Sequence, residues 1–255
     1  MESSEGRWSH LLPLSHLVVI PTYNEKENIA RMIDAVMARP TGFHLLVVDD
    51  GSPDGTADVV REGMKRHEGR VHILERAGKQ GLGTAYIAGF RWALENGYET
   101  VTEMDADFSH DPADLDRLHA RISEGADVAV GSRYVKGGSV VNWPLNRVLL
   151  SKYASVYVRL ITWMPVHDTT AGFVAWRRSV LETIDLDKIR FVGYAFQIEM
   201  KFAAWKLGFK VSEIPIAFTD RVEGESKMSS GIFQEAVMGV WKMRWFALFN
   251  DYRQR

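Results

Sequence analysis

Short apolar runs alternate along the first half of the chain with segments whose apolar residues have helical spacing. The runs are rich in β-branched side chains, which is typical of buried strands. We expect strands at residues 17–20, 45–48, 71–74, 100–104 and 127–130. The expected helices begin at Asn24 with a capping-box-like Glu27, cover 56–66 and 84–95, and begin again where Asp111 caps Pro112. This alternation predicts an α/β domain with a largely parallel sheet wound by helices, and ligands that bind beyond the carboxyl ends of the strands.

The composition fits one globular domain with a C-terminal appendage and excludes several functional classes. The chain has 255 residues, a formal net charge of −2 and no cysteine. Neither disorder nor binding of nucleic acid is indicated. Disulfides, thiolate metal sites and cysteine nucleophiles are excluded, which fits the cytosol. The first 16 residues lack the basic start and apolar run of a signal peptide, and no uncharged stretch reaches about 18 residues, so we expect neither a signal peptide nor a transmembrane helix.

Two aspartates, Asp105 and Asp107, come directly after the fourth expected strand. On an extended segment residues i and i+2 face the same way, so both carboxylates converge on one point, as hard divalent ions require. The other interpretation is a pair of acids that cap the next helix, but Asp111 already takes the cap position. The pair therefore predicts a divalent metal that carries a nucleotide diphosphate.

The loops after the first two strands carry side chains that suit a nucleoside. In Pro21-Thr-Tyr-Asn-Glu25 a tyrosine ring that can stack on a base precedes a carboxylate that accepts hydrogen bonds. Asp49 and Asp50 end the second strand with side chains on opposite sides, so one is able to hold a nucleoside while the other supports the turn. Both loops also obey the rules for an ordinary helix cap or turn, and neither decides the function alone.

Nine motifs, taken in order, resemble the inverting family 2 glycosyltransferases, in particular the polyprenyl-phosphate (dolichyl-phosphate) mannose synthases. The resemblance covers residues 17–230 and implies a GT-A-type, Rossmann-like fold. The motifs are Val18-Val-Ile-Pro-Thr-Tyr-Asn-Glu25, Val47-Val-Asp-Asp-Gly-Ser-Pro-Asp-Gly-Thr56, Gly81-Leu-Gly-Thr-Ala-Tyr86, Asp105-Ala-Asp107, Gly131-Ser-Arg-Tyr134, Asn142-Trp-Pro144, Asp168-Thr-Thr-Ala-Gly-Phe173, Gly193-Tyr-Ala-Phe-Gln-Ile-Glu-Met200 and Asp220-Arg-Val-Glu-Gly-Glu-Ser-Lys227.

The resemblance implies transfer of mannose from GDP-mannose to a polyprenyl monophosphate, with inversion at the anomeric carbon. One branch of the family has a glutamine metal ligand at the position of Ser109, so a ligand role for this serine is not expected. The matching positions implied for the donor are Pro21, Tyr23, Glu25, Val48 and Asp50 for the nucleotide, Asp105, Ala106 and Asp107 for the diphosphate and its Mg²⁺ or Mn²⁺, and Arg221 and Lys227 for the donor phosphates.

Arg133, Arg147 and Ser151 match the site that grips the acceptor phosphate in these enzymes. The planar fork of an arginine pairs with two phosphate oxygens at once. Without the resemblance, Arg147 is equally well a surface residue at a helix end. The implied catalytic set is Asp107, Arg133, Arg221 and Lys227, with Asp168 and Glu199 as supporting carboxylates and no assigned base.

The tail, residues 231–255, predicts an amphipathic helix, whereas residues 1–16 form an N-terminal extension. Residues 232–249 are mostly apolar and include Trp241 and Trp245, which suit a membrane interface, and Lys242 and Arg244, which suit anionic headgroups. We expect contact with a membrane surface or a membrane-embedded partner, and a peripheral location on the cytoplasmic side. The alternative is a helix packed onto its own domain or a second copy, because a wide apolar face also describes a buried helix.

Three other functions stay open at this point. One is the same fold using UDP-glucose, and a second is a sugar-phosphate nucleotidyltransferase, which releases pyrophosphate instead of a nucleoside diphosphate. The third is a non-catalytic subunit on the same fold, since a fold alone does not guarantee chemistry.

Overall fold

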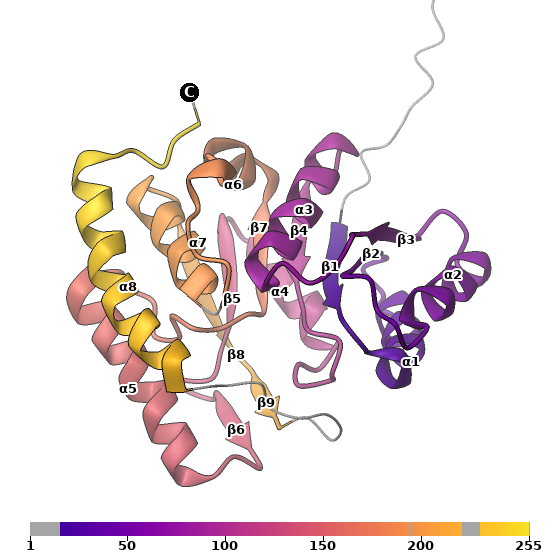
Figure 1. Cartoon of the computed structure of the whole chain (residues 1–255), viewed down its shortest axis with the longest axis horizontal. Coiled ribbons are helices and arrows are strands. Elements are labelled where there is room, and N and C mark those ends of the chain that lie inside the picture. The colour runs from indigo at the N-terminus through magenta and orange to yellow at the C-terminus, as the bar shows by residue number, and fades with distance from the viewer. Residues whose placement is uncertain (1–15, 194, 221–229, 255) are drawn as a thin grey trace, which may run out of the picture.

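The computed structural model describes residues 16–193, 195–220 and 230–254, with the backbone alone at 230–237. A seven-stranded sheet runs in the order β3-β2-β1-β4-β7-β5-β8, and β6 and β9 form a small second sheet (Figure 1). The strands are β1 (His16–Thr22), β2 (His44–Asp49), β3 (Val71–Glu75), β4 (Thr100–Glu103), β5 (Val128–Ser132), β6 (Ser139–Val141), β7 (Val174–Arg177), β8 (Val211–Pro215) and β9 (Ala217–Thr219). The α-helices are α1 (Lys26–Met37), α2 (Thr56–Arg66), α3 (Leu82–Glu95), α4 (Asp114–Ser123), α5 (Leu145–Thr162), α6 (Arg178–Thr183), α7 (Ala195–Lys206) and α8 (Ser230–Phe249).

Helices cover both faces of the large sheet, so its central strands are apolar on both sides. Along β1, Leu17 and Val19 belong to one apolar cluster and Val18 and Ile20 to the other, as the two-residue period of a strand requires. The first cluster includes residues of α3, α5, α7 and α8, and the second includes residues of α1, α2 and α4. All five predicted strands are present, and the largely parallel wound sheet is confirmed.

The structure adds one feature that was not predicted and corrects one local prediction. β7 is antiparallel to both β4 and β5, and sequence pattern alone did not reveal this insertion into an otherwise parallel sheet. The helix predicted to begin at Pro112 begins at Asp114, and Asp111 instead accepts a hydrogen bond from the backbone N–H of Ala113 in the preceding turn.

The C-terminal helix α8 packs against α5 and α7 through one face. Val240, Met243 and Ala247 on this face are buried in the main apolar cluster, together with Tyr252 of the tail that follows. The tail is also held by the backbone, since Asp185 N–H donates to the Tyr252 carbonyl oxygen at 2.7 Å. No helix in the described part of the chain is long and apolar enough to cross a membrane.

His16, at the start of β1, makes the stability of the fold depend on pH. Its Nδ1 lies 2.8 Å from Thr100 Oγ1, and its ring centroid lies 3.8 Å from that of His119. Burial lowers the pKa of His16 to about 4, and the neighbouring imidazoles of His119 and His44 add to the shift. The unfolded chain therefore takes up this proton at a higher pH than the folded chain does.

We expect the free energy of unfolding to fall as the pH drops from about 6.5, the ordinary pKa of histidine, towards 4. Above pH 6.5 the neutral His16 should contribute fully to this free energy. Because the ring is only half-buried, the loss from this residue should be about 1 kcal/mol, well below the full linkage value. Urea unfolding of the wild type and of His16→Phe between pH 4 and pH 6.5 measures this loss of stability. The same dependence on pH in both proteins would contradict the assignment.

Candidate active site

The unusual loops meet at one edge of the sheet. β1 pairs in parallel with β2 and with β4, so their carboxyl ends and the loops that follow lie side by side. Thr22 at the end of β1 is in register with Asp49 at the end of β2. Ligands of wound sheets bind at this edge, and we take it as the candidate active site.

The β1–α1 turn is held by the loop after β2. Asn24 has a left-handed backbone (φ 59°), and α1 begins at Lys26 with Glu25 in the N-cap position, so the predicted capping box at Asn24 and Glu27 is wrong. The N–H of Glu25 donates to Thr56 Oγ1 at 3.1 Å and that of Lys26 to Asp54 Oδ2 at 3.1 Å. Partners from the neighbouring loop thus satisfy the start of the helix, which leaves Asn24 free of the capping role.

The nucleotide residues implied by the resemblance lie at the ends of β1 and β2 and in the loops that follow, in different environments. The ring of Tyr23 has Lys79 Nζ at 5.1 Å from its centroid. Val48 is fully buried in β2 between Pro21 and Leu74, so its side chain belongs to the core. A nucleotide can approach Val48 only along the backbone.

Asp49 and Asp50 have different partners, as expected for adjacent side chains that point to opposite sides of a strand. Asp49 accepts hydrogen bonds from Thr22 Oγ1 at 2.8 Å and from Ser52 Oγ at 2.6 Å, which fixes the turn. Asp50 forms an ion pair with Arg76, whose Nε lies 2.6 Å from Asp50 Oδ1, and both side chains are nearly buried. Arg76 also donates to Thr84 Oγ1 at 3.0 Å. Sequence reasoning missed Arg76, because nothing in the sequence links it to an aspartate 26 residues away.

Asp105 and Asp107 lie in the loop that follows β4. Asp107 is 8% exposed and accepts a hydrogen bond from the N–H of Ser109 at 3.0 Å. The Asp105 carboxylate is more open and lies 4.0 Å from Nδ1 of His110. Burial raises the pKa of Tyr86 well above its ordinary value, and the charges of Asp105, Glu103 and Asp107 raise it further.

The carboxylates of this loop fit a divalent metal ion that is coordinated partly by the protein and partly by a substrate. Among the residues described, no group of three acidic or histidine side chains is arranged to hold a metal ion by itself. Magnesium is usually held by one or two carboxylates together with substrate phosphates and water, and Asp105 and Asp107 provide such a pair. The neighbouring Ala106 is buried and offers no side-chain ligand.

His110 was not predicted as part of the site. It is buried, its ring stacks on Phe173 with centroids 4.8 Å apart, and it meets Phe218 edge-on at 5.1 Å. Burial lowers its pKa to about 4. The imidazole is therefore neutral near neutral pH and adds no positive charge beside Asp105 and Asp107. The short sequence distance from the aspartate pair was the only signal of its place.

Arg133 is held in place by Asp168. Its Nε and Nη2 each lie 2.7 Å from a different oxygen of the Asp168 carboxylate, and both side chains are buried. Burial alone would raise the pKa of Asp168, but the hydrogen bonds and charge of Arg133 outweigh it and leave this pKa below its ordinary value. The fork of Arg133 is thus committed to a carboxylate, and Asp168 orients this arginine.

Arg147 is the more accessible of the two arginines. Its guanidinium lies 3.9 Å above the ring of Trp143, and Nη1 donates to both carboxylate oxygens of Asp220 at 3.0 and 3.1 Å. Ser151 follows one turn later on the same face of α5. The structure therefore brings Arg147 and Ser151 together, with Trp143 as a platform. The predicted residues Arg221 and Lys227 lie outside the described part of the chain.

A buried polar network under the site was also not predicted. Glu103 at the end of β4 accepts hydrogen bonds from Trp176 Nε1 at 2.6 Å and from Gln197 Nε2. Lys201 of α7 donates to the carbonyl oxygen of Ala171 at 2.6 Å. Burial raises the pKa of Glu103 and lowers that of Lys201, and the opposite charges of the two groups counter both shifts. The other supporting carboxylate of the sequence analysis, Glu199, accepts from the N–H of Arg190 at 2.7 Å and is part of the scaffold.

Comparison with protein families decides the class of this site. The model of a family described as "Glycosyl transferase family 2" matches residues 17–185. This chain belongs to glycosyltransferase family 2. It is therefore a glycosyltransferase, and the resemblance seen in its motifs is confirmed.

Relatives of this family 2 glycosyltransferase are similar over most of the chain. A polyprenol monophosphomannose synthase of Mycolicibacterium smegmatis is 49% identical over 230 residues, or 89% of this chain and 87% of the relative. An undecaprenyl-phosphate mannosyltransferase of Micrococcus luteus is 45% identical over 94% of this chain and 98% of the relative. A dolichol-phosphate mannosyltransferase of Pyrococcus furiosus is 35% identical over 89% of this chain and 63% of the relative.

Solved structures confirm the GT-A fold of the domain. Glucosyl-3-phosphoglycerate synthase from Mycobacterium tuberculosis, in complex with Mn²⁺, UDP and glucosyl-3-phosphoglycerate, superimposes with a TM-score of 0.65 over 90% of this chain and 79% of the other. The same enzyme with Mn²⁺, UDP and phosphoglyceric acid gives 0.66 over 90% and 78%. Both are 17% identical to this chain, so the likeness concerns the fold alone.

Proposed function

We propose that this glycosyltransferase moves mannose from GDP-mannose to the phosphate of a polyprenyl monophosphate, with inversion at the anomeric carbon. The observation that carries the proposal is that three relatives, 49%, 45% and 35% identical, bear names that combine mannose with a polyprenol, undecaprenyl or dolichol phosphate. The lipid differs among these names and the sugar does not.

The donor side of the proposal uses the edge formed by β1, β2 and β4. Tyr23 and Glu25 face the base and ribose, and Pro21, Val48 and Asp50 complete the nucleotide site. Asp105, with the backbone of Ala106, and Asp107 hold the diphosphate and a divalent ion, Mg²⁺ or Mn²⁺, a choice supported by their paired carboxylates. When bound, this ion neutralises charge on the departing diphosphate. Arg221 and Lys227 are proposed to share that task.

The acceptor side uses Arg147, Ser151 and the charge of Arg133. A phosphate monoester is already an anion near neutral pH, so a strong general base is less necessary than for a sugar hydroxyl. The residues of the chain then act by holding the attacking oxygen in line with the anomeric carbon. Asp168 supports this role, because it fixes the plane of the Arg133 guanidinium with two 2.7 Å hydrogen bonds.

The proposed acceptor is a membrane lipid, so we also propose that the protein works as a peripheral protein on the cytoplasmic side of a membrane. Contact is made directly or through a membrane-embedded partner. The exposed side chains of α8 support this, since Trp241 is 58% and Trp245 is 67% exposed.

Turnover assays with a short polyprenyl phosphate test the proposed reaction. We expect polyprenyl-phosphate mannose and GDP from GDP-mannose in the presence of Mg²⁺ or Mn²⁺, and much slower turnover with UDP-glucose. Preference for UDP-glucose would overturn the choice of donor. Release of pyrophosphate would indicate a nucleotidyltransferase, and binding of the donor without any turnover would indicate a non-catalytic subunit.

Replacing Arg147 with alanine should raise the KM for the acceptor at least about tenfold and leave the KM for GDP-mannose within about twofold, because a lost charge-assisted fork affects only the ligand that it holds. Its ion pair with Asp220 is about one-third exposed on both sides, so the fold should tolerate the change. Steady-state kinetics with each substrate varied in turn measure the effect.

Arg159→Ala is the matched control, because Arg159 lies in the last turn of the same helix. This variant should keep both KM values. Equal increases in the two KM values of Arg147→Ala would contradict the separation of donor and acceptor sites.

A further inference from the structure

An exposed apolar face runs over the neighbouring helices α5 and α8. The two helices pack together, and the guanidinium of Arg244 lies 5.2 Å from the ring of Trp163 at the end of α5. Large exposed apolar side chains that gather on neighbouring helices mark an interaction surface. Its large side chains, each at least 41% exposed, are Leu145, Leu149, Leu150, Tyr153, Val156, Leu160 and Trp163 from the α5 region and Met238, Trp241, Trp245, Leu248 and Phe249 from α8.

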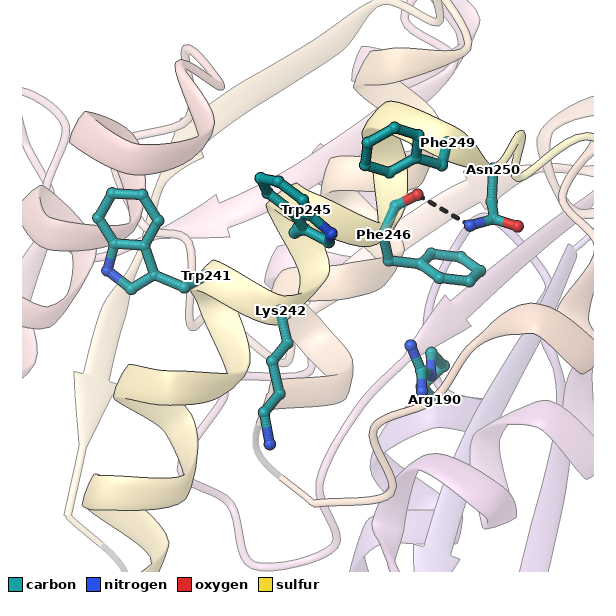
Figure 2. A pocket seen from close by; sticks show the side chains of 7 residues that line it. All are labelled: Arg190, Trp241, Lys242, Trp245, Phe246, Phe249 and Asn250. Atoms are coloured by element: carbon teal, nitrogen blue, oxygen red, sulfur yellow. Dashed lines mark hydrogen bonds between the residues drawn. The ribbon is translucent and has the colours of Figure 1, made fainter.

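A pocket of about 650 Å³ opens beside this face, on the C-terminal half of α8. Its apolar lining comes from Trp241, Trp245, Phe246 and Phe249, and its positive charge from Arg190 and Lys242. Figure 2 shows Arg190 and Lys242 below the helix in this view, with Trp245 and Phe249 above it. The pocket therefore combines two cations with aromatic rings, as an anionic amphiphile requires.

The two cations of the pocket have no direct ion-pair partner within the described part of the chain. Neither Arg190 nor Lys242 forms an ion pair there, and the guanidinium of Arg190 lies 5.0 Å from the ring of Phe246. The acid near Arg190 is Glu199, but its carboxylate is turned inward. One oxygen accepts from the backbone N–H groups of Arg190 and Phe191, and the other accepts from the Tyr252 hydroxyl at 3.0 Å. The charge of Arg190 counters part of the rise in the pKa of Glu199 that burial causes, but the two side chains form no direct ion pair.

We propose that this pocket binds the phosphate-bearing headgroup of an anionic phospholipid while the α5–α8 face rests on the bilayer. Arg190 and Lys242 pair with the phosphate, and the tryptophans lie at the headgroup level, where amphipathic rings are favoured. The inference rests on the proposed function, because a lipid acceptor is what brings the enzyme to a membrane. It concerns a phospholipid of the bilayer and not the acceptor, whose proposed arginine is Arg147 in the first turn of α5.

Deleting the tail is not a suitable test, although the sequence suggests it. Val240, Met243 and Ala247 are buried, and the Tyr252 hydroxyl donates to Glu199, so a truncation would open the core. Substitutions of the exposed cations avoid this difficulty.

The experiment measures binding of the full chain to vesicles of phosphatidylcholine with and without phosphatidylglycerol. We expect phosphatidylglycerol to strengthen binding, and Arg190→Gln and Lys242→Gln each to weaken this binding about fivefold, with about twenty-five-fold for the double variant. Binding to pure phosphatidylcholine should not change. Lys152→Gln is the matched control, since Lys152 is exposed on α5 beside Tyr153 but does not line the pocket. A loss for Lys152→Gln equal to that for Lys242→Gln would show diffuse attraction and overturn the site.

A second measurement uses soluble dihexanoyl phosphatidylglycerol in calorimetric titrations. Saturable binding that disappears in the Arg190→Gln/Lys242→Gln variant supports the site. Equal binding of inorganic phosphate alone would make it a free-phosphate site, and a dimer that Trp245→Ser disrupts would assign the face to a second copy; either result overturns the proposal. Transfer to a short soluble acceptor should be the same in the double variant and the wild type. Absence of transfer in the wild type would reject the proposed function without affecting the lipid measurements.

Discussion

Replacing Asp107 with alanine should lower the rate of the proposed mannose transfer by about a thousandfold and abolish the dependence of donor binding on metal. Asp107 provides one of the two carboxylates of the proposed metal site, and electrostatic stabilisation of a departing group of this kind typically contributes 10²–10³-fold or more. The carboxylate accepts a hydrogen bond from the N–H of Ser109 at 3.0 Å, so its loss should cost only about 1 kcal/mol of the free energy of unfolding. Removing one of several mutually repelling acids offsets part of that cost.

The measurements are kcat with Mn²⁺ and donor titrations with and without the metal. Asp111→Ala is the matched control, because Asp111 is an exposed acid of the same segment whose carboxylate accepts from the N–H of Ala113. This control should keep turnover within a few-fold. Near-normal turnover by folded Asp107→Ala would remove Asp107 from the proposed site.

Replacing Lys201 with methionine should lower the free energy of unfolding by roughly 3 kcal/mol, because removing one partner of a buried charge pair leaves the other charge uncompensated. Lys201 and Glu103 are both fully buried, and each counters the effect of burial on the pKa of the other. The methionine keeps most of the volume of the lysine stem, so the loss should come from the charge and from the hydrogen bond to Ala171. Urea unfolding measures the change.

A double-mutant cycle with Glu103→Gln separates the charge from the packing. If the ammonium compensates Glu103, the double variant Glu103→Gln/Lys201→Met should be more stable than Lys201→Met alone. Burial raises the pKa of Glu103 to about 7 in the wild type, where the charge of Lys201 holds it down. Without Lys201 the folded variant keeps this acid protonated to a higher pH, so its loss of stability relative to the wild type should grow as the pH rises above about 7. Additive effects of the two substitutions at every pH would contradict the coupling.

The sequence alone determined the alternating strands and helices of the first half of the chain. Local patterns carry this information, because side chains that face the core recur at a fixed spacing in a strand and in a helix. Examples are the apolar runs around Val18 and Val47 and the helical spacing of Ile29, Ile33 and Val36. The motifs determined the family in the same way, since a glycosyltransferase site is built from loops whose positions follow from the strands before them.

The tertiary structure decided which side chains are partners. Arg133 and Asp168 are 35 residues apart in the sequence, Arg147 and Asp220 are 73 apart, and both pairs exist only because the chain folds back on itself. The antiparallel insertion of β7 between β4 and β5 likewise depends on long-range pairing.

The tertiary structure also decided what α8 presents to its surroundings. The sequence shows a helix that is apolar nearly all round, and this pattern left packing on the domain and contact with a membrane as alternatives. In the fold the two faces of α8 lie in different environments. Val240, Met243 and Ala247 are buried in the core, while Trp241 and Trp245 stay exposed. Periodicity places residues around a helix axis, but only the packing of α8 on α5 and α7 determines which side is covered.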